Sequence, residues 1–266
     1  MPTVHQLFIY PLKSAQGIES NYLTYNHRGP SFDRHWMVVN AKGRFLTQRQ
    51  YPSMCLIHTQ LDEGKLILNA PNQSSLAIEF SQTESSNNEC VVDVWKDQVT
   101  AIDHGQEAAN WISSYLNEEC RIVSMPKTSE RKVDLDFASN NETVSFADGF
   151  PSLVISQESL DDFNSKLDTP ISMIHFRPNI VINGLSPYEE DQIKAIKING
   201  ITFTLVKPCS RCIIPSIDPK TGKKNIDIAK ALSKYRRRDN ATYFGQNALH
   251  DAQGEIKVGD QVEIIR

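Results

Sequence analysis

Long apolar runs are absent from this sequence of 266 residues. No stretch approaches the roughly 18 consecutive apolar residues that a membrane-spanning helix needs. The N-terminus also has neither the cationic start nor the apolar segment of a signal peptide. We therefore expect no membrane partner.

An excess of positive charge is missing too, and cysteine is scarce. The 28 Lys and Arg against 32 Asp and Glu give a net charge of −4, so we expect no general attraction to nucleic acid. The five cysteines are an odd number, spread over a chain of ordinary size. Secreted disulfide frameworks use even, dense sets of cysteines. The sequence therefore predicts reduced thiols and a cytoplasmic location.

Two further motifs are lacking. The sequence has no GxGxxG-type phosphate loop for a dinucleotide. It also has no Cys-x4-Cys-x2-Cys run of the kind that holds a plant-type iron–sulfur cluster. An oxidoreductase built on this chain is therefore expected to take its electrons from a separate protein.

What the sequence does contain is a pair of thiols two residues apart, in Lys207-Pro208-Cys209-Ser210-Arg211-Cys212. A cation beside a thiol favours the thiolate, which is the nucleophilic and metal-binding form. The β-branched residues at 213–217 and the turn signals at 218–222 place the pair on a strand or loop, whereas thioredoxin-like pairs open a helix. No second close pair or nearby histidine completes a structural zinc site. The remaining alternative is that both cysteines are buried and structural. The neighbouring Ser210 and Arg211 argue against it, because polar and charged residues are rarely buried in an apolar core.

Short strand patterns dominate the rest of the chain. Apolar and β-branched runs predict strands over 4–10, 36–40, 44–47, 55–60, 65–68, 76–80, 91–94, 152–155, 180–182, 193–198 and 201–206. Helical spacing predicts helices over 105–117, after the capping residue Ser156, and from about 227. Residues 82–89 are expected to form an exposed loop, 125–141 a linker or lid, and 256–264 a closing hairpin.

This order of elements favours a mainly β protein with a few helices, of the α+β class. Many short strands before one helix suggest a small β-barrel or sandwich in the first half. We place an N-terminal β-barrel domain in residues 1–122 and a second β-barrel domain in residues 123–266.

A series of short motifs occurs in a distinctive order. The series begins with Tyr10-Pro11-Leu12-Lys13-Ser14 and Asp33-Arg34-His35-Trp36, and continues with 145–151, 176–182, 209–212, 218–222 and 256–260. Together they resemble the MOSC proteins, named for the molybdenum cofactor sulfurase C-terminal domain, in the branch that carries an N-terminal β-barrel partner domain. That branch includes the mitochondrial amidoxime-reducing components, and the resemblance extends over nearly the whole chain.

The resemblance implies a molybdenum–molybdopterin cofactor with one protein ligand to the metal, the thiolate of Cys212. Thiolate is a soft ligand that suits a dithiolene-bound metal. A cofactor phosphate needs cations and polar donors, and the resembling positions supply Lys13, Ser14, Arg34, Arg177, Ser210 and Arg211. Asp148 and Asn179 are expected to contact the pterin or the substrate, and with Cys212 they form the expected catalytic set. Thr47 and Arg49 are further candidates for the cleft, while His35 and His175 are read as structural.

The implied activity is reduction of small N-hydroxylated compounds, namely amidoximes, hydroxylamines or N-hydroxylated base analogues. The implied electron donor is a separate ferredoxin-like, flavin or haem carrier. Two alternatives stay open. Cys209 or Cys212 could carry a persulfide in a sulfur-carrier module, or the chain could bind and deliver the molybdenum cofactor without turnover.

Overall fold

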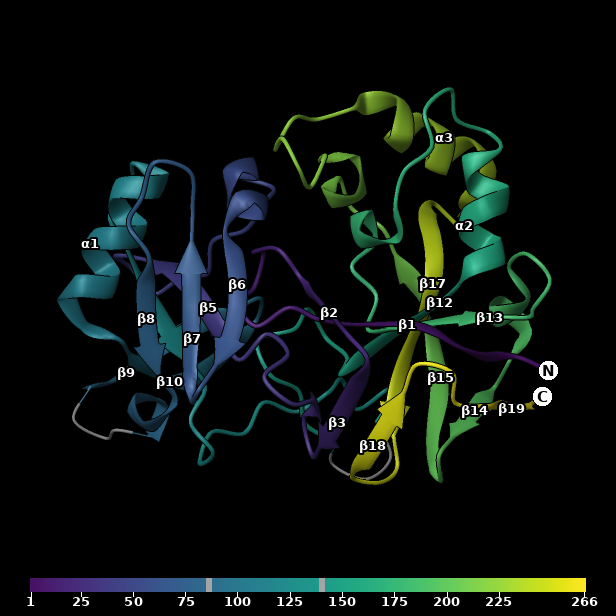
Figure 1. Ribbon diagram of the computed structural model, residues 1–266, viewed down its shortest axis with the longest axis horizontal. Helices are drawn as coiled ribbons and strands as arrows, with labels where there is room; N and C mark the ends of the chain where they lie inside the picture. The colour runs from purple at the N-terminus through teal and green to yellow at the C-terminus, as the bar shows by residue number, and fades with distance from the viewer. Residues whose placement is uncertain (85–87, 139–141) are drawn as a thin grey trace.

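The computed structural model describes residues 1–84, 88–138 and 142–266. Its strands gather in two lobes that lie side by side (Figure 1). The first lobe contains β5 to β11 and α1, and the second contains β1 to β4 and β12 to β19 with α2 and α3. The expectation of a mainly β protein with a few helices is confirmed. Within the described ranges, no helix has both the length and the apolar character needed to cross a membrane.

The first lobe is built from two small antiparallel sheets and one helix. One sheet has the order β5 (Trp36–Asn40), β11 (Cys120–Ser124), β10 (Asp97–Asp103) and β9 (Glu89–Val94). The other has the order β6 (His58–Asp62), β7 (Lys65–Asn69) and β8 (Leu76–Glu79). Helix α1 (Gly105–Leu116) buries Ala108, Trp111 and Ile112 on the face that its apolar spacing predicts. Two 3-10 helices, η1 (Pro52–Leu56) and η2 (Phe80–Glu84), complete the lobe.

The second lobe is organised around one long sheet. Its order is β19 (Val262–Ile265), β14 (Ala195–Ile198), β15 (Ile201–Ser210), β17 (Ala241–His250), β12 (Ser152–Ser156), β13 (Ile180–Asn183), β1 (Thr3–Ile9) and β2 (Ile18–Ser20), with β16 (Arg237–Arg238) paired to β17. A bridge between Thr3 and Gln261 joins the two ends of the sheet. The sheet therefore closes on itself.

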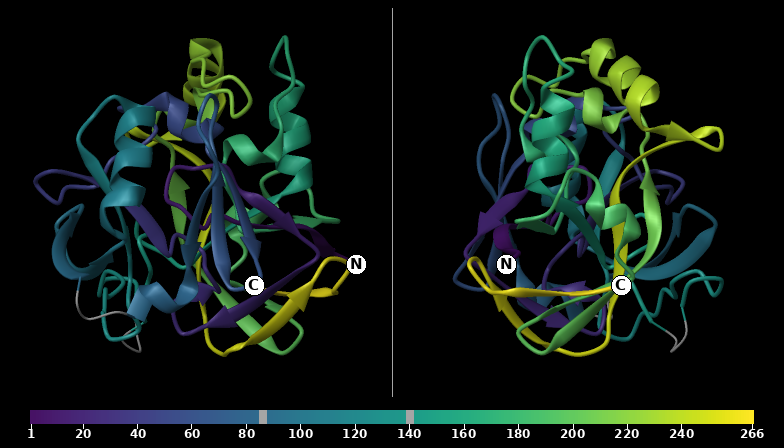
Figure 2. Two further views of the ribbon diagram at one scale, coloured as in Figure 1. Left: turned by 60° about the vertical axis from the view of Figure 1, so that its left-hand side comes forward. Right: turned by 90° about the vertical axis from the view of Figure 1, so that its right-hand side faces the viewer.

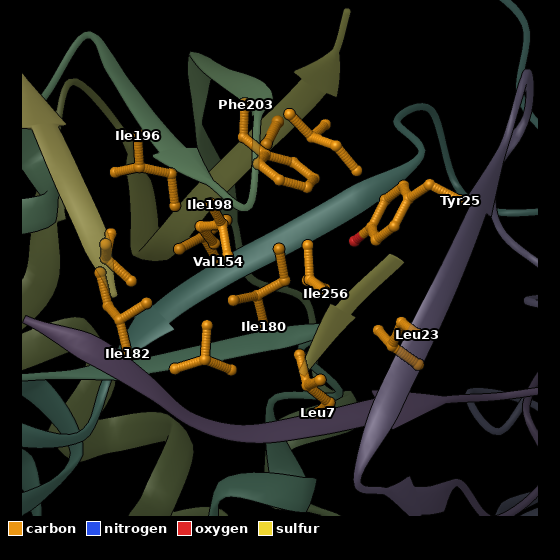
Figure 3. Close-up of a cluster of buried hydrophobic side chains, with 14 of the residues drawn as sticks. Leu7, Leu23, Tyr25, Val154, Ile180, Ile182, Ile196, Ile198, Phe203 and Ile256 are labelled. Carbon is orange, nitrogen blue, oxygen red and sulfur yellow. The ribbon is translucent and has the colours of Figure 1, made fainter. Parts of the chain in front are cut away.

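A smaller sheet packs against this one. It consists of β18 (Gly254–Lys257), β3 (Tyr22–Asn26) and β4 (Gly29–Pro30). Figure 3 shows Leu23 and Ile256 from this sheet meeting Leu7, Ile180 and other apolar side chains of the long sheet in one core. The inward-facing residues come from alternating strand positions, as burial of one sheet face requires.

Two short helices cover one end of the second lobe. Helix α2 (Gln157–Asn164) and helix α3 (Ile226–Arg236) lie at the same end of the molecule in all views (Figures 1 and 2). Ser156 caps α2 by accepting a hydrogen bond from the Ser159 amide, as predicted. Short 3-10 turns η4 (Met173–His175), η5 (Glu189–Gln192) and η6 (Ile214–Ser216) complete this part of the chain.

Several local predictions were wrong. The closing segment 256–264 is not a hairpin, because β18 pairs with β3 whereas β19 pairs with β14. Residues 55–60 begin in the 3-10 helix η1 and become a strand only at His58. The ten-residue strand β17 was missed, although it pairs with both β15 and β12. The predicted loop 82–89 and linker 125–141 include residues 85–87 and 139–141, which lie outside the described residues.

The beginning of the chain belongs in space to the second lobe. Strand β1 pairs with β13, with Leu7 opposite Ile180, and β3 pairs with β18. The chain then crosses to the first lobe with β5 and returns with β12. A domain boundary between residues 122 and 123 stays a prediction. The turn after β1 and the turn before β5 lie where the two lobes meet.

Candidate active site

One cavity of about 450 Å³ lies where the two lobes meet. Its cationic lining residues are Lys13, Arg34, Arg49, Arg177, Lys207 and Arg211. Among the lining residues that the structure describes, Asp148 is the only carboxylate. Because the chain as a whole carries a charge of −4, positive charge is concentrated in this cavity. Such a cavity favours an anionic ligand.

The cavity wall is formed by residues at strand ends and turns in unusual backbone conformations. Ser14, Arg34, Trp95 and Arg177 all line it, and all have positive φ values, of 70°, 47°, 59° and 56°. Such values are uncommon for residues other than glycine and tend to cluster at functional sites. In this cavity, the four residues with positive φ come from four separate turns of the chain.

Lys13 joins the two sides of the cavity. Its Nζ donates to the Phe146 carbonyl at 2.7 Å and to Asp148 Oδ1 at 2.6 Å. Burial lowers the pKa of Lys13, and Asp148 partly offsets this effect. Burial also opposes ionisation of Asp148, but Lys13 and then Arg49 outweigh it and hold the pKa of that carboxyl well below its usual range. Asp148 is therefore a carboxylate at neutral pH.

Arg131 fixes the segment that carries Asp148. The Arg131 guanidinium donates to the carbonyls of Ser145, Ala147 and Asp148, and pairs with Asp97 at 2.8 Å. Its side chain is only 4% exposed. Arg131 lies within residues 125–141, for which the sequence predicts a linker or lid. Its partners are mostly backbone carbonyls, which leave no pattern in the sequence.

Arg34 and Arg177 both pack over one aromatic ring. Their guanidinium carbons are 4.2 Å and 4.1 Å from the centroid of the fully buried Tyr10 ring. Arg177 also donates to the Ala15 carbonyl at 2.6 Å, and Arg34 pairs with Asp33. Burial, followed by the neighbouring Arg34, lowers the pKa of Arg177 to about 10. Arg177 therefore remains cationic at neutral pH.

Asn179 holds Arg34 in position through hydrogen bonds inside the protein. Its Oδ1 accepts hydrogen bonds from Arg34 and from the Leu153 amide, each at 3.2 Å. Its Nδ2 donates to the Phe8 carbonyl at 3.2 Å. With both amide atoms engaged inside the protein, Asn179 positions Arg34 and connects β1 to β12. Direct contact of Asn179 with pterin or substrate stays a prediction.

The two thiols lie at the end of β15, on another wall of the cavity. Cys209 is half-buried and Cys212 is exposed. Arg211 donates to Cys209 Sγ at 3.0 Å and to the Phe176 carbonyl at 2.7 Å. The cation of this motif therefore contacts the thiol of Cys209. The Nε of Arg211 is buried and has no hydrogen-bond partner in the described part of the chain.

The structure brings every predicted site residue to this one cavity. The lining includes Lys13, Ser14, Arg34, Asp148, Arg177, Asn179, Ser210, Arg211 and Cys212, together with Thr47, Arg49 and Cys209. The roles of these residues stay predictions. Sequence reasoning missed Lys207 and Trp95, as well as Arg131 behind the wall. His175 lies outside the lining, where its Nδ1 bonds to the Pro215 carbonyl at 2.8 Å.

No protein-only metal centre is evident beside these thiols. Within the described ranges, no three or more His, Cys, Asp or Glu side chains are grouped so that they could hold a metal ion.

Comparison with known proteins connects this cavity to a family. Residues 1–119 match the MOSC N-terminal beta barrel domain, and residues 141–263 match the MOSC domain. The mitochondrial amidoxime-reducing component 1 of Mus musculus is 32% identical over 281 residues, which cover 99% of this chain and 82% of the mouse protein. The Homo sapiens protein of the same name is also 32% identical over 281 residues, covering 99% of this chain and 83% of the human one. This chain belongs to the MOSC-domain family.

A second kind of MOSC-domain relative is a larger protein. The molybdenum cofactor sulfurase of Bos taurus is 29% identical over 283 residues, which cover 97% of this chain but 32% of the sulfurase. The resemblance read from the motifs is confirmed at the level of the family. In this MOSC-domain protein, the interval between the two matched domains contains Arg131, which holds the cavity wall.

Proposed function

We propose that this MOSC-domain protein is a molybdenum-cofactor-dependent reductase of small N-hydroxylated compounds, such as amidoximes, hydroxylamines or N-hydroxylated base analogues. The observation that carries the proposal is that the exposed thiol of Cys212 shares one cavity with six cationic side chains. The names of the mouse and human relatives support the same chemistry.

The residues of the cavity fit a molybdopterin-bound molybdenum. Cys212 would supply the single thiolate ligand, a soft donor suited to such a metal. Lys13, Arg34 and Arg177 would bind the phosphate together with Ser14, Ser210 and Arg211, since paired guanidiniums recognise phosphate well. The buried Nε of Arg211 has no hydrogen-bond partner among the described residues, so a bound anion could accept a hydrogen bond from it. When bound, the cofactor supplies two-electron redox chemistry.

The protein's own residues define how the substrate is oriented. Reduction of an N–OH group takes two electrons and two protons and gives N–H and water. Because Asp148 is ionised, it would accept hydrogen bonds from N–H groups of the pterin or the substrate and would not donate the protons. Lys13 holds that carboxylate in position by donating a hydrogen bond to it. Asn179 would act as a positioning residue by holding Arg34 in place.

We assign the supply of electrons to a separate donor protein, either a ferredoxin-like, a flavin or a haem carrier. The five cysteines of this chain stand at positions 55, 90, 120, 209 and 212, a spacing that does not match the ligand run of a plant-type iron–sulfur cluster.

The test compares the two thiols in protein loaded with the molybdenum cofactor. Reduced viologen supplies electrons to an amidoxime substrate, and molybdenum and pterin contents are measured in parallel. Cys212→Ser should lose turnover and molybdenum, because a neutral hydroxyl replaces a soft anionic ligand. Cys209→Ser is the matched control and should keep a measurable fraction of both. Equal losses of activity with unchanged metal content in both variants would contradict the assignment of Cys212.

A sulfur-carrier function is the second candidate, and one contact favours it. The Arg211 guanidinium lies 3.0 Å from Cys209 Sγ, where it would stabilise an anionic sulfur. The relationship to a molybdenum cofactor sulfurase points the same way. Incubation with a persulfide donor followed by mass spectrometry tests it. One added sulfur atom on Cys209, in protein that shows no viologen-driven turnover, would favour this function over the reductase.

A further inference from the structure

The charge of the chain is strongly segregated around the thiol loop. Residues 207–243 contain ten Lys and Arg against three Asp and Glu, an excess of +7. The rest of the chain contains 18 Lys and Arg against 29 Asp and Glu, an excess of −11. Residues 207–243 are therefore a cationic stretch in a chain of net negative charge, and this stretch begins at the cavity wall.

Most of these cations face solvent. Lys220, Lys223 and Lys224 are exposed, and no carboxylate of the described residues forms an ion pair with them. In α3 the buried residues Ile228 and Leu232 face the core. Lys230 and Lys234 project from the opposite side of that helix and are exposed.

Exposed apolar side chains lie among the cations. Ile213, directly after the exposed Cys212, is 37% exposed, and Ile226 at the start of α3 is 63% exposed. Apolar contacts at the centre with charged residues around them are the usual composition of a protein-binding surface. The thiol of Cys212 lies at the edge of this surface and also lines the cavity.

The surface is anchored to both lobes. After η6 the chain extends from the second lobe toward the first (Figure 1). There the Cys55 thiol donates to the Asp218 carbonyl at 3.6 Å, and Gly222 packs close to the Pro52 carbonyl. The Asn225 amide donates back to the Ser216 carbonyl at 2.7 Å. The backbone that carries these lysines is therefore tied to both lobes.

We propose that the exposed surface of residues 212–237 is the docking site for an acidic electron-carrier protein, which approaches the cavity from the Cys212 side. The proposal rests on the reductase function proposed above. Electrostatic complementarity raises the association rate of transient redox partners, whose interfaces are small. Docking at this surface brings the carrier to the loop that carries the proposed metal ligand. An extended nucleic acid is less well suited, because the rest of the molecule is strongly negative and repels it.

The test uses the full-length protein and an acidic plant-type [2Fe–2S] ferredoxin as the probe, with binding measured directly by titration at low and high salt. The variant Lys220→Glu/Lys223→Glu/Lys224→Glu reverses three charges of the docking site. The matched control Lys42→Glu/Lys194→Glu/Lys197→Glu changes the net charge equally at exposed positions elsewhere. A basic c-type cytochrome serves as a carrier of the wrong charge.

We expect the unaltered protein to bind the ferredoxin and to lose at least tenfold in affinity between low and high salt, because exposed charges are screened. The docking-site variant should bind at least tenfold more weakly at low salt, whereas the control variant should change less than threefold. The basic cytochrome should not bind. Turnover driven by reduced viologen should be equal in all three proteins, because this small donor needs no docking site.

Three results would overturn the proposal. The first is equal ferredoxin binding by the docking-site variant and the control variant. The second is no binding of the ferredoxin by the unaltered protein. The third is tighter binding of single-stranded RNA or of anionic lipid vesicles than of the ferredoxin, which would assign the surface to a different partner. Absence of viologen-driven turnover in molybdenum-replete protein would instead refute the reductase function, while the binding titration still reports on the surface.

Discussion

Tyr10 shows at the scale of a single residue how the cavity holds two like charges close together. The guanidiniums of Arg34 and Arg177 both pack over the Tyr10 ring, at 4.2 Å and 4.1 Å from its centroid. Such contacts stabilise desolvated cations by about 2 kcal/mol or more. The hydroxyl of Tyr10, by contrast, is buried and has no hydrogen-bond partner among the described residues. The ring and the hydroxyl should therefore have opposite effects on stability.

The substitution Tyr10→Phe should leave the free energy of unfolding unchanged or raise it, because an unsatisfied buried hydroxyl costs about 1–3 kcal/mol. Tyr10→Leu should lower it by about 2–5 kcal/mol through the lost cation–π contacts and the cavity left behind. Urea unfolding curves measure both effects.

Tyr25 provides the matched control for the hydroxyl. It is also fully buried, but its hydroxyl is 3.0 Å from Ser152 Oγ. Tyr25→Phe should therefore cost about 1–2 kcal/mol, the typical net value of a lost buried hydrogen bond. Equal losses for Tyr10→Phe and Tyr25→Phe would mean that the Tyr10 hydroxyl has a partner after all.

At the scale of elements, the cavity depends on strand ends that only meet in the folded protein. The turn after β1, the turn before β5, the segment before β12 and the end of β15 supply its walls. Arg131 lies outside all of these elements, yet it holds the segment before β12 by hydrogen bonds to its backbone. The Arg131 guanidinium therefore connects the chain segment between the two matched domains to the cavity wall.

We expect Arg131→Met to release residues 145–148 while the packing of the aliphatic stem is kept. Three carbonyls lose donors and Asp97 loses its buried partner, so the free energy of unfolding should fall by about 2–4 kcal/mol. Hydrogen exchange should increase at residues 145–148 more than in α1.

Arg121→Met is the control for Arg131→Met. Arg121 pairs with Asp103 near the surface, where its side chain is 37% exposed. Surface ion pairs contribute about 0–1 kcal/mol. If both variants lose the same stability and hydrogen exchange stays unchanged at 145–148, Arg131 does not hold the cavity wall.

At the scale of the whole molecule, buried histidines link folding to pH. Burial, followed by Arg28, lowers the pKa of His35 to about 3, and burial lowers the pKa of His104 to about 4. Both nitrogens of His104 are buried without a partner in the described part of the chain. Each ring is therefore neutral in the folded protein at a pH where the unfolded chain binds a proton, since the ordinary pKa is about 6.5.

The unfolded state thus binds more protons between about pH 4 and pH 6.5, and the free energy of unfolding should fall as the pH is lowered through this range. The slope is expected to reach about 1.4 kcal/mol per pH unit for each histidine. Urea unfolding at several pH values measures it. The variant His104→Leu removes one titrating group and should reduce the slope by that amount. An unchanged slope would show that His104 is protonated in the folded protein.

The sequence by itself determined the features that depend on neighbouring residues. Apolar spacing was sufficient for α1, and Asn199-Gly200 forms the tight turn between β14 and β15 with φ values of 46° and 84°. The resemblance to the MOSC proteins that the ordered motifs carry was sufficient to place Lys13, Arg177 and Cys212 in one predicted site.

Only the tertiary structure decided which distant segments meet. β18 and β19 are close in sequence but pair with β3 and β14, because strand pairing is set by burial of a shared core and not by chain proximity. Arg131 is part of the site because it donates hydrogen bonds to backbone carbonyls. Every residue has a backbone carbonyl, so no sequence pattern predicts these contacts. Arg211 donates to the neighbouring Cys209 thiol and also to the Phe176 carbonyl, 35 residues away, which only folding brings within reach of its guanidinium.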